Sequence, residues 1–319
     1  MNEENTIQNS NLETNKVYLG DCIEVMKTFP QDSIACCITD PPYNYEFIGH
    51  KWSDSEVQRR TERVKDSKTM VKNIPYGSGL AGGVRNARWY ERNRNNDLDY
   101  MKWCQLWTDE LFKICKAGAP VAVFNSNRSI AHVQIALENS GFYTRDVLVY
   151  RRNSGIPRGL NLEKKLEKMG HQDAPKWNGW HSAFRNEWEA VVIVQKPLIN
   201  NYWETLQETH VGVFKTVNKD GSFQSNIFEN LSKKDKSENY SHCTVKPLGL
   251  IKKLIDTLVP VHEENIIFDP FSGSGTTLVA AQELGFDFVG IEIEENYIPI
   301  INQRLEESKN NKALTPTLF

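Results

Sequence analysis

Short apolar runs alternate with helical spacing in two separate parts of the chain. Apolar runs without polar alternation are typical of strands that are buried on both faces of a parallel sheet. Because such runs alternate with helical patterns, the sequence predicts a doubly wound, Rossmann-like α/β domain with right-handed crossovers. The expected strands cover 17–19, 34–39, 119–124, 142–150, 265–268 and 286–291, and the expected helices cover 22–28, 101–115, 129–139, 248–258, 276–284 and 295–307.

Two stretches interrupt this alternation. Residues 48–97 lack periodicity and are glycine-rich, and an aperiodic stretch of this length is usually functional or disordered. Residues 151–240 hold many turn residues and tryptophans, with one strand pattern at 190–195. We therefore expect a flexible tail (1–15), a sheet domain in two halves (16–150 and 241–308) with a mobile basic loop (48–97), an inserted irregular region (151–240) and a second tail (309–319).

Charge is segregated along the chain, although the formal net charge of the 319 residues is only −3. Residues 48–97 carry 11 Lys and Arg against 6 Asp and Glu, and residues 151–185 carry 8 against 3. Two basic segments on an otherwise acidic body suggest a local surface for a polyanion, although charge alone favours two solvated loops equally.

Several classes of protein are disfavoured by the sequence. No apolar run approaches the roughly 20 residues of a membrane span, and the first residues lack the basic start and apolar core of a signal peptide. The six cysteines form no C-x-x-C pair, which argues against a zinc site, so we expect no metal. Cysteines among apolar residues are typical of a reduced, cytoplasmic protein.

A glycine loop at 268–277 (FDPFSGSGTT) carries the first chemical motif. An expected strand runs into Gly273 and Gly275 and then into a helix, where free N–H groups favour an anionic ligand. Glu292 ends the next strand 19 residues after Gly273, the spacing at which a carboxylate meets ribose hydroxyls. Leu278 replaces the third glycine of the dinucleotide fingerprint, so a nicotinamide nucleotide is the weaker alternative.

The second motif, Thr39-Asp40-Pro41-Pro42-Tyr43-Asn44, follows the expected strand 34–39. Ligands of open α/β sheets bind beyond the carboxyl ends of the strands. Asp40 and the Pro41 carbonyl can each accept one N–H of an exocyclic amine, while Tyr43 can stack on a planar base. The alternative is a proline-rich turn in which Tyr43 is an ordinary packing residue. This alternative is much less favoured because the glycine loop occurs in the same chain.

Together the two motifs resemble those of the S-adenosylmethionine-dependent DNA amino-methyltransferases in their beta arrangement. In that circularly permuted order the Asp-Pro-Pro-Tyr motif comes first, a target-recognition region follows and the cofactor loop comes last. The resemblance covers 16–150 and 241–308 well, whereas the middle region resembles a phage and restriction-modification subgroup more weakly. The resemblance implies a catalytic set of Asp40, Pro41, Pro42 and Tyr43, and a cofactor-binding set of Asp21, Cys22, Lys246, Asp269, Phe271, Ser272, Gly273, Gly275, Thr276, Thr277 and Glu292.

The resemblance also implies the reaction: methyl transfer to the N6 of adenine in double-stranded DNA, after the base has left the duplex. Adenine is favoured over cytosine N4 because cytosine N4 enzymes of this arrangement more often show Ser at position 40. A catalytically inactive nucleic-acid-binding relative is the third alternative. A cytosine C5 mechanism is disfavoured because Cys104 follows Trp103 rather than a proline. RNA and protein-glutamine enzymes usually show Asn-Pro-Pro-Tyr, with the cofactor loop first.

Residues 151–240 are expected to recognise the DNA sequence. We expect Trp177 and Trp180 of this region to be core residues rather than base contacts. A bacterial or phage-encoded protein is implied, which acts as a monomer or a homodimer, and a cognate restriction endonuclease is a further candidate partner. The candidate DNA contacts are Arg151, Arg152, Arg158, Lys164, Lys165, Lys176 and Arg185.

Overall fold

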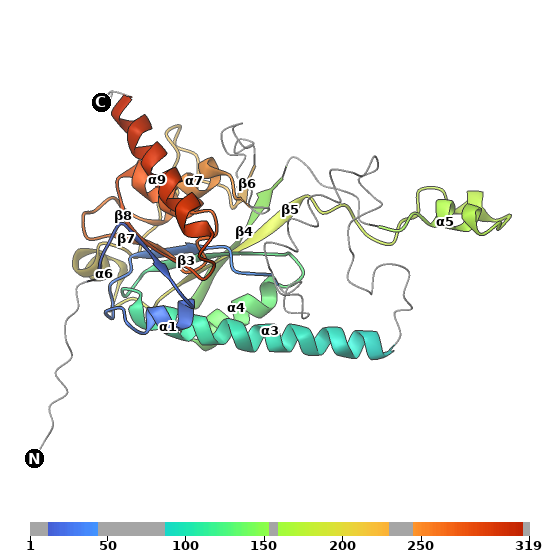
Figure 1. Ribbon diagram of the computed structural model, residues 1–319, viewed down its shortest axis with the longest axis horizontal. Helices are drawn as coiled ribbons and strands as arrows, with labels where there is room; N and C mark the ends of the chain where they lie inside the picture. Colours follow the sequence, from blue (N-terminus) through green and yellow to red (C-terminus); the bar gives the residue numbers. More distant parts are fainter. Residues whose placement is uncertain (1–11, 44–86, 153–158, 230–244, 315–319) are drawn as a thin grey trace, which may run out of the picture.

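A mixed β-sheet runs through the centre of the computed structural model, which describes residues 12–43, 87–152, 159–229 and 245–314 (Figure 1). In this part of the chain eight strands lie in the order β1-β8-β7-β2-β3-β5-β4-β6. Strand β5 is antiparallel to both of its neighbours, and every other pairing between these strands is parallel. The strands are β1 Lys16–Leu19, β2 Cys36–Thr39, β3 Pro120–Asn125, β4 Tyr143–Arg151, β5 Trp188–Gln195, β6 Ile227–Phe228, β7 Ile266–Asp269 and β8 Asp287–Glu292.

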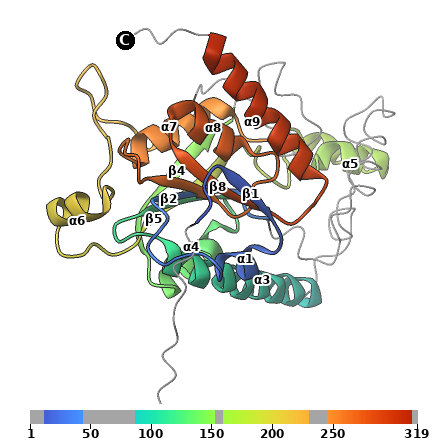
Figure 2. The same cartoon turned by 60° about the vertical axis from the view of Figure 1, so that its left-hand side comes forward.

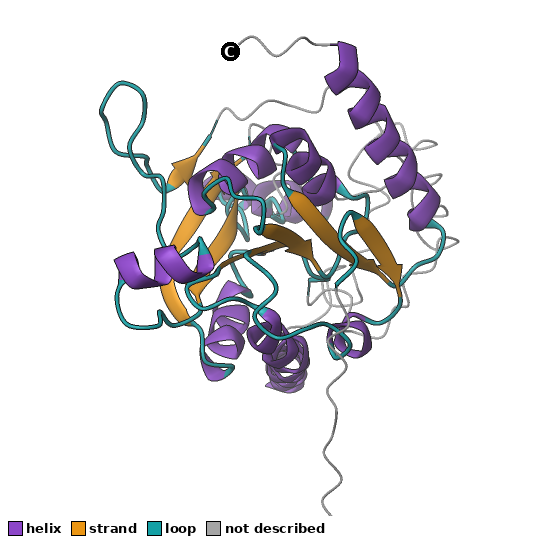
Figure 3. Cartoon of the chain, turned by 90° about the vertical axis from the view of Figure 1, so that its left-hand side faces the viewer, coloured by secondary structure: helices purple, strands orange, loops and turns teal. Residues whose placement is uncertain are grey.

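Helices cover both faces of the sheet, as the doubly wound prediction requires. Helices α1, α3 and α4 lie on one face, and α7, α8 and α9 lie on the other (Figures 1 and 2). Figure 3 shows the sheet edge-on between these two layers. The helices are α1 Cys22–Met26, α3 Ala87–Ile114, α4 Ile130–Asn139, α5 Leu162–Lys168, α6 Tyr202–Thr209, α7 Leu248–Leu258, α8 Thr276–Leu284 and α9 Tyr297–Leu314, with a short 3₁₀ helix, η1, at Ala174–Trp177.

The apolar runs of the sequence form the buried centre of the sheet. All residues of β2 and β3 are buried, and β5 is buried from Ala190 onward. Five cysteines of the described residues are free and buried, which fits their expected role as small hydrophobic residues. Every strand and helix expected from the pattern is present, and most ends shift by one or two residues; the larger differences at α3 and α9 are given below. No helix among the described residues is long and apolar enough to cross a membrane.

Strands β4 and β5 form an antiparallel pair whose connection leaves the body of the protein. Arg151 pairs with Trp188 at the open end of this pair, and residues 152–187 connect the two strands. Residues 159–187 of this connection, here called the arm, carry α5 and project away from the sheet (Figure 1). The strand expected at 190–195 is therefore confirmed, but it belongs to the central sheet although it lies within the range 151–240.

Three boundaries differ from the sequence prediction. Helix α3 begins at Ala87, so residues 87–97 are helical rather than loop, whereas residues 44–86 of the expected loop lie outside the described part. Helix α9 continues to Leu314, into the expected tail. Both additions are mostly polar, and an apolar repeat therefore cannot reveal them. Residues of the expected first tail are held in place, because Asn15 Nδ2 donates to Asp287 Oδ1 at 2.7 Å.

Candidate active site

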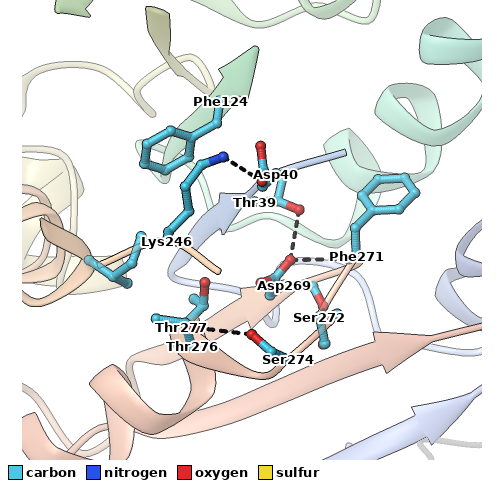
Figure 4. A pocket seen from close by; sticks show the side chains of 12 residues that line it. Thr39, Asp40, Phe124, Lys246, Asp269, Phe271, Ser272, Ser274, Thr276 and Thr277 are labelled. Atoms are coloured by element: carbon cyan, nitrogen blue, oxygen red, sulfur yellow. Dashed lines mark hydrogen bonds and ion pairs between the residues drawn. The ribbon is translucent and has the colours of Figure 1, made fainter. Parts of the chain in front are cut away.

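The two chemical motifs meet at one edge of the sheet. Strands β7, β2 and β3 are parallel neighbours, so Asp269, Asp40 and Asn125 all lie at their carboxyl ends. The Thr39 hydroxyl donates to Asp269 Oδ1 at 2.7 Å, which joins the end of β2 to the end of β7 (Figure 4). Residues separated by 230 positions in the sequence therefore share one site, at the place where open α/β sheets bind ligands.

A cavity of about 420 Å³, a volume that includes open solvent at its mouth, lies between the two motifs. Its wall combines the polar glycine loop with the rings of Phe124 and Phe271, a mixture that suits a small ligand with charged and apolar parts. The lining residues are Thr39, Asp40, Phe124, Lys246, Ile251, Asp269, Phe271, Ser272, Gly273, Ser274, Thr276 and Thr277.

Asp40 and Lys246 form an ion pair at the wall of this cavity. Lys246 Nζ lies 2.6 Å from Asp40 Oδ2 (Figure 4). The same Nζ lies 3.3 Å from Glu189 Oε2. Within the described part of the chain Asp40 Oδ1 is buried and accepts no hydrogen bond. Burial raises the pKa of the Asp40 carboxyl, and the neighbouring ammonium opposes that rise. The free lone pairs of Oδ1 are thus available to a donor that enters the site.

The backbone that follows Asp40 is fixed by side chains of other elements. Tyr100 of α3 donates its hydroxyl to the Pro42 carbonyl at 3.0 Å, and Asn125 Nδ2 donates to that hydroxyl at 2.8 Å. Pro41 is buried, whereas Pro42 is exposed. The Tyr43 hydroxyl lies 3.3 Å from Lys246 Nζ, and burial raises the pKa of Tyr43 far above its ordinary value.

The glycine loop is ordered by two acidic side chains. Asp269 Oδ1 accepts the backbone N–H of Phe271 at 3.1 Å in addition to the Thr39 hydroxyl. Glu292 Oε2 accepts the N–H of Gly273 at 2.7 Å, and burial raises the pKa of its carboxyl. Gly275 has a φ of 77°, a left-handed conformation that glycine adopts without strain.

The remaining residues of the predicted cofactor set lie around the same edge. Asp21 caps α1 by accepting the Ile23 N–H at 2.8 Å. Cys22 is buried, and burial raises the pKa of its thiol to about 12. Both residues follow β1, whose last residue pairs with Glu292. Asp21 and Cys22 are therefore near Glu292, although they do not line the cavity.

The predicted DNA contacts fall on the arm and at its root. Lys164 and Lys165 are exposed on α5, while Lys176 pairs with Asp173 at 2.5 Å on η1. Arg185 pairs with Glu187 at 3.1 Å within the arm. At the root of the arm, where the chain leaves β4, Arg151 pairs with Glu229 at 3.3 Å. Among the described residues, Arg152 is the one predicted DNA contact that pairs with a residue beside the cavity, Glu189. Arg158 lies outside the described residues.

The expectation that both arm tryptophans are core residues is wrong for Trp180, which is 63% exposed. Trp177 is 39% exposed, and the two rings meet edge to face with their centroids 6.0 Å apart. Phe184 is 98% exposed. The arm is too thin to bury large side chains, because it packs only on itself: α5 and η1 contact each other and no other described element to a comparable extent.

Sequence reasoning missed three residues that the structure brings to the site. Glu189 lies at the start of β5, beside the end of β3, and its Oε1 is 3.0 Å from Arg152 Nη1. Arg304 of α9 donates to the Ser274 carbonyl at 2.6 Å and supports the glycine loop from behind. The ring centroid of Phe124 lies 5.1 Å from Lys246 Nζ. No motif marks these residues; only the strand order and the helix packing bring them there.

A cluster of His210, His262 and Glu264 lies away from the cavity, before the amino end of β7. The two imidazole rings stack at 3.6 Å between centroids, and Glu264 Oε2 lies 3.4 Å from His210 Nε2. His262 Nδ1 accepts the backbone N–H of Glu264 at 3.2 Å. These groups thus already have partners in one another.

A family model described as DNA methylase, for the N6 and N4 enzymes, matches residues 34–303. The chain belongs to this N6/N4 DNA methylase family. The type II methyltransferase M.HindIII of Haemophilus influenzae is 31% identical over 312 residues, which cover 92% of this chain and 96% of that protein. M.HinfI of Haemophilus influenzae is 26% identical over 310 residues, which cover 95% of this chain and 72% of that protein.

Solved structures confirm the Rossmann-like fold of the family. TTHA0409 from Thermus thermophilus has a TM-score of 0.56 at 16% identity and covers 92% of this chain and 95% of that one. The complex of M1.HpyAVI with SAM has a TM-score of 0.53 at 19% identity, with 91% and 98% covered. The cytosine-N4-specific PvuII DNA methyltransferase has a TM-score of 0.55 at 14% identity, with 93% and 91% covered.

The buried Asp269 carboxyl makes a testable contribution to stability. Burial raises its pKa from 3.8 to about 6, so the folded state holds a proton that the unfolded state releases. This contribution is present in acid and is lost as pH rises through about 6, by roughly 1.4 kcal/mol between pH 5 and pH 8. Asp269→Asn cannot titrate and keeps an oxygen for Thr39 and Phe271.

We therefore expect the stability of Asp269→Asn, relative to the wild type, to improve as pH rises from 5 to 8. Urea unfolding of both proteins at several pH values measures the difference. A constant difference across this range would contradict the assigned pKa.

Proposed function

We propose that this protein is a site-specific DNA methyltransferase that transfers a methyl group to the N6 of adenine in double-stranded DNA. The single observation that carries the proposal is the buried Oδ1 of Asp40, which has no hydrogen-bond partner among the described residues and lies at the wall of a cavity that the glycine loop also lines. An exocyclic amine has two N–H donors, and Asp40 together with the Pro41 carbonyl supplies two acceptors that follow one strand.

The proposed role of the Asp40 loop is to orient a poor nucleophile. The lone pair of an exocyclic base nitrogen is delocalised into the ring. When Asp40 and Pro41 accept both N–H groups, the nitrogen moves toward tetrahedral geometry and its lone pair becomes available. The charge of Asp40 also stabilises the positive charge that develops on the nitrogen. Tyr43 is assigned to stack on the flipped base, which requires its hydroxyl to move from its place beside Lys246.

The cofactor of this methylase family is S-adenosyl-L-methionine, which supplies an electrophilic methyl group. The residues of the cavity fit such a ligand. Glu292 is a buried carboxylate at the end of β8, and its oxygens retain lone pairs for ribose hydroxyls after accepting two backbone N–H groups. Phe271 offers an apolar ring, held against Trp107 at 5.4 Å between centroids. In this proposal Ser272, Gly273, Gly275, Thr276 and Thr277 shape the pocket.

Adenine N6 is proposed over cytosine N4 because an aspartate stands at position 40. The family includes both kinds of enzyme, so methylation-sensitive sequencing of DNA from cells that express the protein is the direct test. A modified adenine at a fixed sequence would support the proposal, whereas a modified cytosine would favour cytosine N4 methylation instead. DNA without modification, together with cofactor binding, would favour an inactive relative.

The arm is the proposed target-recognition element. It projects from the same edge of the sheet as Asp40, because β4 ends and β5 begins at that edge. Exposed lysines on α5 and the exposed rings of Trp180 and Phe184 supply groups for phosphates and bases. The similarity to type II methyltransferases supports a role in restriction and modification, with a cognate endonuclease as a candidate partner and the cytoplasm as the place of action.

The first prediction separates catalysis from binding at Asp40. Asp40→Asn keeps the shape of the side chain but presents an N–H donor toward the target amine, so the hydrogen bond is lost or reversed. We expect methyl transfer to fall by at least ~10³-fold, about 4 kcal/mol in the transition state. Tritiated-methyl incorporation and filter binding on the same DNA measure both properties. Near-normal turnover would remove Asp40 from the proposed role.

The second prediction concerns the cofactor pocket. Gly273→Arg places a long side chain beside Glu292 and fills the cavity, so calorimetry should detect no binding of S-adenosylmethionine. The wild type should bind with micromolar affinity, about −7 to −8 kcal/mol. Lys309→Ala, an exposed change on α9, serves as the control that leaves affinity unchanged. Unchanged affinity in Gly273→Arg would argue against this pocket.

The third prediction concerns the arm. If Lys164 neutralises a phosphate, Lys164→Ala should lower the slope of log affinity against log salt by about 0.9 through counterion release. Lys309→Ala, an exposed change on α9, removes the same charge and should leave the slope unchanged. Equal slopes for the wild type and Lys164→Ala would place the DNA elsewhere.

A further inference from the structure

Four charged side chains of alternating sign run from the cavity to the root of the arm. Asp40 pairs with Lys246 at 2.6 Å, Lys246 with Glu189 at 3.3 Å, and Glu189 with Arg152 at 3.0 Å. The first three are largely buried, with side chains 22%, 12% and 14% exposed. These residues come from four separate segments: the ends of β2 and β4, the start of β5 and the loop that precedes α7, where Lys246 is the second residue before the helix. A chain assembled from four segments at the wall of a cavity suggests a task beyond stability.

We propose that Lys246 and Glu189 are positioning residues for the target amine, which they influence through Asp40. Lys246, shared between two carboxylates, holds Asp40 by its Oδ2 and keeps it ionised, so that Oδ1 alone faces the reacting nitrogen. Glu189 is a second carboxylate on the Lys246 ammonium and therefore weakens the attraction between Lys246 and Asp40. Together Asp40, Lys246 and Glu189 carry one net negative charge beside the cavity. This inference rests on the proposed function and adds two residues to it.

The hydrogen bonds and burial support this division of roles. A carboxylate that must accept an N–H has to be ionised, and burial alone works against ionisation. Lys246 is the one cation that contacts Asp40 among the described residues, and the rings of Phe124 and Tyr43, at 5.1 and 5.5 Å from its Nζ, exclude water from one side. Its Nζ contacts Oδ2 and leaves Oδ1 open.

Glu189 has the opposite effect on Asp40. Two carboxylates on one ammonium repel each other, so Glu189 disfavours the ionised form of Asp40 while Lys246 favours it. Arg152 is 30% exposed and balances Glu189 from the side away from the cavity.

Other titratable groups face this centre and must be held constant in any test. Tyr43 comes from the loop after Asp40, Tyr150 from β4 and Asp269 from β7, and Tyr100 of α3 contacts the same loop. Burial raises the pKa of Tyr150 and that of Tyr43 above the ordinary tyrosine value. The tyrosines therefore stay neutral in acid, and Asp269 is common to all the variants below.

The experiment measures single-turnover methyl transfer against pH, with saturating S-adenosylmethionine and long unmethylated phage DNA as the substrate. The acid limb of this profile reports the group that must be ionised. Lys246→Met removes the cation beside Asp40, so we expect the midpoint of the acid limb to move to higher pH by about one unit or more. Glu189→Gln removes a like charge, so we expect the midpoint of the acid limb to move to lower pH by roughly half a unit. Lys246→Arg should restore the position of the wild-type limb.

Shifts of opposite sign are the signature of the proposal, because a packing defect lowers the rate at every pH without moving the limb. If Lys246→Met has no measurable turnover, Glu189→Gln decides: a limb at the wild-type position overturns the inference, and so do two shifts of the same sign. Circular dichroism confirms that each variant is folded. Absence of methyl transfer by the wild type would instead contradict the proposed function itself.

Discussion

The hydrogen bond between Thr39 and Asp269 joins the two halves of the site. It connects the carboxyl ends of two neighbouring parallel strands, β2 and β7, that come from opposite ends of the chain. Both partners are buried, so the bond also satisfies polar groups whose isolation would be costly. The glycine loop depends on the same carboxylate, because Asp269 holds the Phe271 N–H as well. The loop, the cavity and the position of Asp40 all follow from this junction.

A second constraint is the cost of buried charge. Removing one partner of a buried ion pair leaves an uncompensated charge, which is strongly destabilising. Alternating signs from Asp40 to Arg152 meet this constraint, since each buried charge has an opposite neighbour. The compensation is incomplete at Asp40 Oδ1, where an acceptor is left without a donor among the described residues. A buried acceptor without a donor calls for an explanation, and a ligand that enters the cavity is the one proposed for Asp40.

The sheet domain could be predicted from the sequence because its strands and helices carry local signals. The apolar run before Asp40, the two glycines after Asp269 and the amphipathic segment at 248–258 each identify an element without knowledge of its neighbours. The antiparallel place of β5 could not be predicted, because a buried strand has the same apolar run in either direction. Glu189 and Arg304 were missed for the same reason: their roles depend on which strand or helix lies beside them.

The arm is the connection of one antiparallel strand pair, and this has a consequence for how the protein can change. The register of β4 and β5 is set along both strands, down to the pair Tyr143 and Gln195, and does not depend on the length of the connection between them. Doubling the length of a flexible connection costs only about 0.6 kcal/mol in closure entropy. Insertions, deletions or whole exchanges between Arg152 and Trp188 can therefore accumulate over evolution, or be engineered, while the cavity at the sheet edge keeps its shape.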